Sequence, residues 1–229
     1  MTGLRPFFSF YGSKYKLATM YPPPRFDRIV EPLAGSAGYS LLYPQRDVRL
    51  FDRDPIIVGV WDYLIKTKTS EIWRLPDLAI DGNVEDLKVC QEAKWLIGFW
   101  VGRGRATPGT RFTPWAAKYP TALWWDERVR DRIVLQQPEI RHWKVQCLSY
   151  EDIELGADAT WFVDPPYSSR AGRAYKFDEI DYRRLGAWCR GRPGQVIVCE
   201  SEGADWLPFK HLAKIRGVAK RSSEAYYAK

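Results

Sequence analysis

The feature that most constrains this chain is a short apolar run followed at once by an acid, two prolines and an aromatic. The run spans residues 159–163, and Asp164, Pro165, Pro166 and Tyr167 come directly after it. An unbroken apolar run of this length is typical of a strand buried in a parallel sheet. The prolines end the strand, because proline donates no backbone hydrogen bond and restricts the residue before it. Since open α/β sheets bind ligands at the carboxyl ends of their strands, the sequence predicts the chemistry here.

These four residues suit a planar base that carries an amine. The Asp164 carboxylate accepts one amine hydrogen, and the carbonyl of Pro165 accepts the other. Two acceptors discourage the nitrogen lone pair from delocalising into the ring, so the amine becomes a better nucleophile. Tyr167 offers a face for base stacking, a contact worth ~1–3 kcal/mol. The alternative is a strand-ending turn with an ordinary capping aspartate.

A second group of motifs lies near the N-terminus. The aromatic segment 7–14 (FFSFYGSK) turns at Gly12 into a predicted helix through Met20. A predicted strand over 26–30 then enters the loop EPLAGSAG, residues 31–38, with a helix expected from about Ala37. Small residues let a cofactor approach the backbone, and a helix N-terminus offers free N–H groups. The two glycines lie three residues apart, which does not fit the G-x-G-x-x-G fingerprint of a dinucleotide-binding oxidoreductase.

A second predicted strand, 48–51, ends at Asp52. An acid in this position suits a ribose, because one carboxylate accepts from two hydroxyls. Asp54 on the same loop is a secondary candidate, and an exposed acidic turn is the alternative. A helix from Ile56 to about Lys66 completes this half of the fold.

These motifs, in this order, resemble those of the Dam-type DNA adenine methyltransferases over about residues 7–62 and 145–200. The resemblance implies an α/β, Rossmann-like class I methyltransferase sheet with an inserted, mainly helical DNA-recognition lobe, and S-adenosylmethionine as cofactor. It implies a catalytic domain of residues 1–66 and 144–229 and a lobe of residues 67–143. The implied cofactor contacts are Phe10, Lys14, Glu31, Pro32, Ala34, Gly35, Gly38, Asp52, Ser149, Tyr150 and Asp164.

The interval from about Thr67 to Arg141 interleaves aromatic and basic residues, a composition suited to phosphate and base contact. Helices are predicted around 70–75, 84–100 and 124–133, and the spacing of Trp95, Phe99 and Trp100 predicts a buried face. A second basic segment follows Tyr167 and is predicted to close over an extruded nucleotide; a solvated surface loop is the alternative for both segments. The predicted DNA-binding residues are Arg103, Arg105, Arg111, Lys118, Arg170 and Arg173.

The rest of the chain supplies further sheet elements. Strands are predicted over 145–148 and 195–200, a helix over 178–189, and a closing hairpin from 211–215 and 224–228. Four widely spaced cysteines and two histidines indicate neither a disulfide framework nor a metal site. The net charge of +7 favours a polyanionic partner, and no apolar signal or membrane-spanning run is visible. We therefore expect a cytoplasmic protein of a bacterial or phage-infected cell, monomeric or weakly dimeric, with DNA as partner and no membrane or metal.

Together these patterns predict a site-specific enzyme that transfers a methyl group from S-adenosylmethionine to N6 of adenine in DNA, with base flipping. Three alternatives stay open. The acceptor amine is instead N4 of cytosine, an RNA base or a glutamine amide; or the chain is a catalytically silent DNA-binding protein on the same fold; or, least favoured, it is a nucleotide-binding oxidoreductase.

Overall fold

The computed structural model describes residues 3–114, 118, 124–216 and 221–229. These residues build a seven-stranded sheet in the order β3-β2-β1-β4-β5-β7-β6. The five strands from β3 to β5 run parallel, and β7 pairs antiparallel with both β5 and β6. The strands are β1 Arg28–Glu31, β2 Asp47–Asp52, β3 Lys144–Cys147, β4 Ala159–Val163, β5 Gly194–Ser201, β6 Lys210–Arg216 and β7 Arg221–Ala228. The predicted Rossmann-like α/β sheet with its closing hairpin is confirmed.

The strand order reverses between β1 and β4. From β1 the chain steps outward through β2 to β3 and then crosses to the other side of β1 to form β4. Ile29 pairs with both Val48 and Thr160, so the carboxyl ends of β2 and β4 flank that of β1. A crevice opens at such a switch point, because the connections leave it in opposite directions. This geometry brings the ends of three predicted site strands together.

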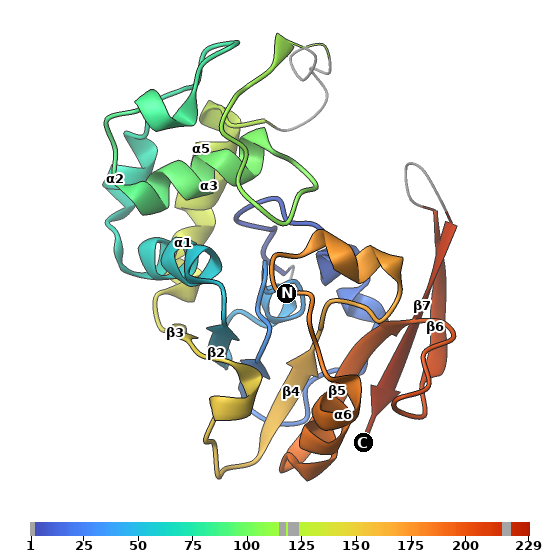
Figure 1. Cartoon of the computed structure of the whole chain (residues 1–229). Helices are drawn as coiled ribbons and strands as arrows, with labels where there is room; N and C mark the ends of the chain where they lie inside the picture. The colour runs from blue at the N-terminus through green and yellow to red at the C-terminus, as the bar shows by residue number, and fades with distance from the viewer. Residues whose placement is uncertain (1–2, 115–117, 119–123, 217–220) are drawn as a thin grey trace.

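Helices cover both faces of the sheet. Alternate side chains of β4 serve the two layers: Phe162 faces the core shared with α1 (Pro55–Lys66), and Trp161 faces the core shared with α6 (Tyr182–Gly191). Helix α1 begins cleanly because Asp54 caps it and Pro55 occupies its first turn. Figure 1 shows α6 in front of β4 and β5, with α1 on the opposite flank of the molecule.

The segment 67–143 lies beyond α1, away from the terminal hairpin (Figure 1). It contains α2 (Thr69–Trp73), α3 (Gln91–Val101) and α5 (Glu127–Gln136) with short 3-10 turns Val84–Asp86 and Gln137–Ile140. Phe99 and Trp100 are buried, as their spacing predicts, and share one apolar core with α1 and the N-terminal segment, whereas Trp95 is only partly buried against that core. Residues 115–117 and 119–123 of this segment, Trp115 among them, lie outside the described residues.

Three predicted helices differ from the structure. The helix expected from about Ala37 is only the 3-10 turn Ser40–Leu42, because Ala37 has a positive φ of 50° and the Ser40 N–H donates to the Glu31 side chain at 2.8 Å. The stretch before Met20 forms two 3-10 turns, Lys14–Lys16 and Ala18–Met20. The helix predicted over 84–100 begins only at Gln91, after a separate turn.

Candidate active site

A cleft lies at the switch point and collects the acids predicted at three strand ends. Glu31 ends β1, Asp52 ends β2 and Asp164 follows β4, and all three line the cleft. One wall is the segment Phe10–Lys14, and the loop 33–36 with Gly38 forms another. The cleft encloses about 700 Å³ of non-protein space, counting its open mouth. Eight of the eleven predicted cofactor contacts line it: Phe10, Lys14, Glu31, Ala34, Gly35, Gly38, Asp52 and Asp164.

Lys14 and Asp164 form an ion pair at the base of the cleft. Lys14 Nζ lies 2.8 Å from Asp164 Oδ1 and donates to the Gly12 carbonyl at 2.8 Å. The Lys14 side chain is 5% exposed, whereas that of Asp164 is 20% exposed, so the carboxylate is reachable from the cleft. Burial raises the pKa of the Asp164 carboxyl, and the Lys14 ammonium opposes that rise. Burial alone would lower the pKa of Lys14, but Asp164 and other acids raise it above its ordinary value, so the ammonium stays charged.

Tyr167 stands beside this pair. Its ring centroid lies 4.8 Å from Lys14 Nζ, a cation–π contact, and its hydroxyl donates to the carboxyl of Glu224 on β7. Burial is also the main cause that raises the pKa of Glu224. The cation over the ring and the hydrogen bond at the hydroxyl fix the orientation of the Tyr167 ring, which a stacking face requires.

Two residues that the sequence analysis did not single out, Tyr182 and Glu200, hydrogen-bond to the turn after β4, and Trp206 bonds to Glu200. The Tyr182 hydroxyl donates to the Pro166 carbonyl at 2.9 Å. Glu200, buried on β5, accepts from the Ser168 N–H at 3.1 Å and from Trp206 Nε1 at 3.0 Å. A turn with two prolines has few backbone donors of its own, so these side chains supply its hydrogen bonds.

The acids that end β1 and β2, Glu31 and Asp52, carry raised pKa values. Burial raises the pKa of Glu31 to about 8, although the Ser40 side chain and N–H oppose the shift. Burial raises the pKa of Asp52 to about 6, against hydrogen bonds from the backbone of Asp54 and Gly35. Those N–H groups lie 2.9 Å from Asp52 Oδ1 and 3.0 Å from Oδ2. A carboxylate has about four lone-pair positions, so Asp52 keeps acceptor capacity toward the cleft.

The glycines of the loop make room for protein as well as for the cleft. A Cβ on Gly38 would lie 2.6 Å from the Tyr15 backbone nitrogen, and one on Gly35, which has a φ of +45°, would lie 2.9 Å from the Phe10 ring. The loop therefore needs glycine in order to pack against the N-terminal segment that carries Phe10 and Lys14. This close packing aligns two motifs that are distant in sequence.

The segment Tyr175–Phe177, at the end of the loop predicted to close after Tyr167, covers one side of the cleft, although none of its three residues was predicted as a site residue. The Tyr175 hydroxyl donates to the Tyr11 carbonyl at 3.2 Å, and Lys176 Nζ lies 3.8 Å from Asp54 Oδ1. The Arg53 guanidinium lies 4.4 Å from the centroid of the Phe177 ring. All these residues line the cleft. The end of the loop after Tyr167 thus bridges to the side of the cleft that carries Tyr11 and Asp54.

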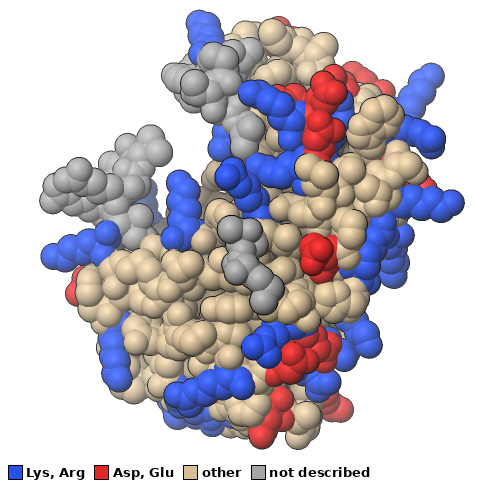
Figure 2. Space-filling view, turned by 180° about the vertical axis from the view of Figure 1, so that it is seen from behind, with Lys and Arg blue, Asp and Glu red and all other residues tan. Residues whose placement is uncertain are grey.

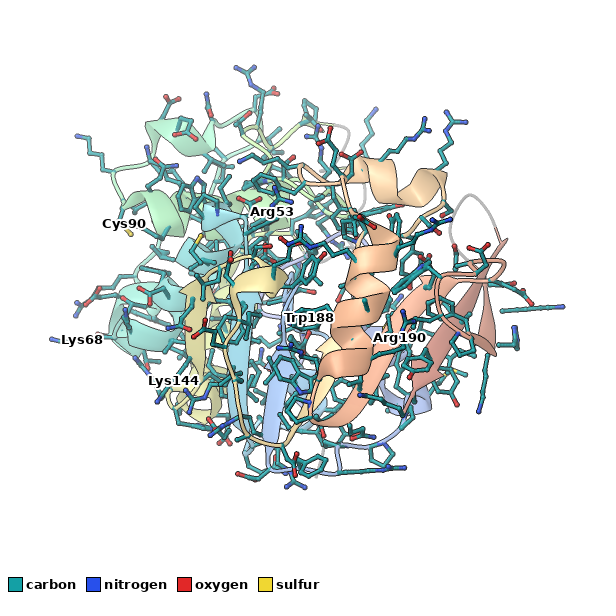
Figure 3. All side chains as sticks on the ribbon, turned by 60° about the horizontal axis from the view of Figure 1, so that its bottom comes forward. Arg53, Lys68, Cys90, Lys144, Trp188 and Arg190 are labelled. Atoms are coloured by element: carbon teal, nitrogen blue, oxygen red, sulfur yellow. The ribbon has the colours of Figure 1, made fainter. Side chains whose placement is uncertain are left out.

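Several predicted site residues lie elsewhere. Tyr150 packs edge-on against Trp188 of α6 at 5.3 Å, and neither it nor Ser149 lines the cleft. Figure 3 labels Trp188, which belongs to α6, and Arg53, which follows β2 and lines the cleft. Pro32, Pro165 and Tyr167 adjoin lining residues without lining the cleft themselves. The six predicted DNA-binding residues are all exposed.

Comparisons with known proteins give similarity of structure only. No protein-family profile matches the chain, and no curated protein matches it by sequence. The chain is similar to the rRNA methyltransferase aviRa from Streptomyces viridochromogenes, with 14% identity, coverage of 96% of this chain and 86% of that one, and a TM-score of 0.43. It is also similar to the glycopeptide N-methyltransferase MtfA complexed with S-adenosylmethionine, with 14% identity, coverage of 96% of this chain and 67% of that one, and a TM-score of 0.36. A conserved hypothetical protein from Streptococcus pyogenes is similar too, with 11% identity, coverage of 87% of this chain and 84% of that one, and a TM-score of 0.36.

The described residues contain no candidate membrane span and no candidate metal cluster. No helix among them is long and apolar enough to span a membrane. No group of three or more metal-ligating side chains gathers among them either.

Proposed function

We propose that the chain is an S-adenosylmethionine-dependent methyltransferase that acts on the N6 amine of adenine in DNA. The observation that carries this proposal is the position of Asp164, which follows a central strand at the switch point and faces a cleft that also holds Asp52 and the glycine loop. Ligands of open α/β sheets bind in this crevice. The motif resemblance over the same residues supports the choice of cofactor.

The cleft residues fit this cofactor. Asp52 keeps free acceptor positions for ribose hydroxyls, and Lys14 supplies a cation for a carboxylate. Phe10, Arg53 and Phe177 supply flat surfaces for an adenine. When bound, S-adenosylmethionine supplies an electrophilic methyl group on sulfur. No metal is required for a direct displacement of this kind, so the protein contributes mainly alignment.

On the acceptor side, Asp164 and the Pro165 carbonyl are the proposed partners of the amine hydrogens. Asp164 Oδ1 is buried and is engaged by Lys14, so Oδ2 of the same carboxylate is the oxygen proposed to accept the amine hydrogen. Tyr167, held by Glu224, is the proposed stacking face. The bracing bonds from Tyr182 and Glu200 keep the acceptor groups in place.

Two features support a DNA substrate: the positive charge of the chain and the position of Asp164 at the base of a cleft. The chain has a net charge of +7, and Figure 2 shows basic side chains spread over one face with fewer acids between them. Because Asp164 lies at the base of a cleft, a base inside a duplex cannot reach it, and the target nucleotide has to be flipped out. The segment 67–143, with its exposed arginines, is the proposed recognition lobe.

The test is methyl transfer with a chemical readout of the product. Purified protein is incubated with methyl-labelled S-adenosylmethionine and unmethylated duplex DNA, and the DNA is digested to nucleosides. Label in N6-methyldeoxyadenosine supports the proposal. Label in N4-methyldeoxycytidine, or transfer only to RNA, moves the activity to another amine; cofactor binding without transfer to any nucleic acid favours the silent DNA-binding alternative.

A further inference from the structure

Three arginines outside the cleft converge from three separate segments. Arg5 belongs to the N-terminal segment, Arg103 to the loop after α3, and Arg132 to α5. The backbone of Arg5 is fixed on α5, because its N–H donates to Gln136 Oε1 at 3.0 Å and its carbonyl accepts from Gln136 Nε2 at 2.8 Å. Gln136 lies one turn after Arg132 on the same helix face.

The third arginine is tied into the same place. The Gly104 N–H donates to Ser9 Oγ at 3.2 Å, and the Tyr11 N–H donates to the Arg105 carbonyl at 3.1 Å. These bonds fasten the loop of Arg103 along the N-terminal segment. The Arg103 guanidinium lies 5.5 Å from the Trp124 ring centroid, just ahead of α5.

Helix α5 carries two other arginines that provide a comparison. Arg128 lies 2.5 Å from the Asp126 carboxylate, and Arg130 pairs with Asp77. Arg132 has no acid partner among the described residues; it stacks over Trp100 at 4.8 Å and reaches the Pro6 carbonyl at 3.5 Å. Arg5 and Arg103 form no ion pair within the described part of the chain either. One helix thus neutralises two of its arginines and leaves the third beside two further cations.

The like charges of this group repel one another. Burial lowers the pKa of both Arg103 and Arg132, and the charges of Arg5 and Arg103 lower that of Arg132 further. Tyr15 and Asp126 partly offset this lowering of the Arg132 pKa, and Asp126 is already engaged by Arg128 and by the first turn of α5. Arg103 and Arg132 are partly desolvated, and none of the three guanidinium groups forms an ion pair with an acid among the described residues, so the cluster is suited to bind an anion.

We propose that Arg5, Arg103 and Arg132 form a binding site for the phosphodiester backbone of the DNA substrate. The inference rests on the proposed function for its ligand and adds a sequence-independent contact. Guanidinium groups suit phosphate because their N–H donors match two of its oxygens at once. The site shares the N-terminal segment with the cleft, since Phe10 and Tyr11 line the cleft a few residues after Arg5. A backbone held here fixes the register in which a flipped nucleotide meets Asp164.

The test is the salt dependence of duplex binding by Arg5→Gln, with Arg128→Gln as a control that removes the same charge from a neutralised arginine. Arg5 is the first choice because its side chain is exposed and only its backbone is bonded to α5, so the fold does not depend on it. Fluorescence anisotropy of a labelled duplex is recorded from ~0.05 to ~1 M NaCl. Each phosphate contact contributes about 0.9 to the slope of log K against log[salt].

The expected result is a slope smaller by about 0.9 for Arg5→Gln and for Arg132→Gln, with binding about eightfold weaker at ~0.1 M salt and unchanged at ~1 M. Arg132→Lys should recover part of the slope, and Arg128→Gln should change it by less than half as much. Equal effects of Arg5→Gln and Arg128→Gln, or no effect of Arg5→Gln, would overturn the site.

Two further measurements distinguish the arginine site from the proposed function and from a site for a free anion. S-adenosylmethionine affinity, measured by calorimetry, should be the same in all variants. If the wild-type chain binds the cofactor but no DNA, the proposed DNA substrate is wrong. If the wild type binds DNA and Arg5→Gln binds it with the same salt dependence, only the proposed arginine site is wrong. Inorganic phosphate that displaces the duplex far better than chloride at matched ionic strength contradicts a backbone site and indicates a site for the free anion.

Discussion

The substitution Asp52→Asn tests the cofactor side of the cleft. Asp52 accepts two backbone N–H groups, from Gly35 and Asp54, and has room for further donors. Asparagine has one acceptor oxygen, so one of the two N–H groups loses its partner and faces an NH₂ group instead. Hydrogen bonds to a charged group contribute about 1.5–3 kcal/mol, so cofactor affinity should fall between about tenfold and a hundredfold at pH 8.

The same residue predicts a pH dependence with a definite sign. Burial raises the pKa of Asp52 to about 6. Ribose hydroxyls donate to the ionised carboxylate, so below this pKa binding must first release a proton, at a cost of up to about 1.4 kcal/mol per pH unit. Affinity for S-adenosylmethionine should therefore weaken as the pH falls from 7 to 5, by up to about tenfold per unit below the pKa.

Calorimetric titration of S-adenosylmethionine at several pH values between 5 and 8 measures both effects. The matched control is Asp54→Asn, because the amide oxygen can still accept from the Ile56 N–H, as Asp54 Oδ1 does at 3.0 Å. The wild type and the control should both weaken as the pH falls, the control at somewhat lower pH because the Asp54 charge helps to raise the pKa of Asp52, and Asp52→Asn should be weak at every pH. Wild-type affinity in Asp52→Asn, or a flat wild-type profile from pH 5 to 7, would refute the reasoning.

Two predictions concern the frame of the cleft. The pKa of Glu31 is raised to about 8 in the folded chain, so the stability that its bound proton confers is fully present below the unfolded pKa of about 4.5 and is lost as the pH rises through 8. The free energy of unfolding of the wild type, measured by urea denaturation, should thus fall by on the order of 2 kcal/mol between pH 5 and 7 relative to that of Glu31→Gln. Parallel pH profiles of the two proteins would contradict the raised pKa of Glu31. Gly38→Ala forces a Cβ to within 2.6 Å of the Tyr15 backbone nitrogen and should cost about 1–3 kcal/mol of stability and weaken cofactor binding, while Gly156→Ala, in open space, should have little effect on either.

The strand before Asp164 was predictable because two local signals agree there. A continuous apolar run and a pair of prolines fix both the burial and the end of the strand. Asp52 was predictable on similar grounds, since an acid after a strand pattern falls at the same sheet edge. The need for glycine in the 31–38 loop was also visible in the sequence. Its main structural cause was not visible, because the contacts with Phe10 and Tyr15 join segments about 25 residues apart.

The missed features depend on packing between distant segments. Glu224 meets Tyr167 across 57 residues, and Glu200 meets Ser168 across 32. Tyr150 has a sequence context that suits a cofactor contact, yet Trp188 provides a buried partner on the opposite layer. The helix expected after the loop fails because Glu31 takes the Ser40 N–H and Ala37 adopts a positive φ. Local pattern cannot reveal such competition, because the competing partner comes from another strand or helix.

The measurement that tests the central claim most directly is the rate of methyl transfer to DNA by Asp164→Ala at saturating S-adenosylmethionine, beside calorimetric binding of the cofactor. Thermal unfolding shows whether the loss of the Lys14 partner leaves the fold intact, since Lys14 Nζ is 2.8 Å from the carboxylate that is removed. The account predicts cofactor affinity within a few-fold of wild type and transfer reduced by about a hundredfold or more, the scale for removal of one preorganised catalytic group. A folded Asp164→Ala chain that methylates DNA at the wild-type rate would contradict the assignment of Asp164.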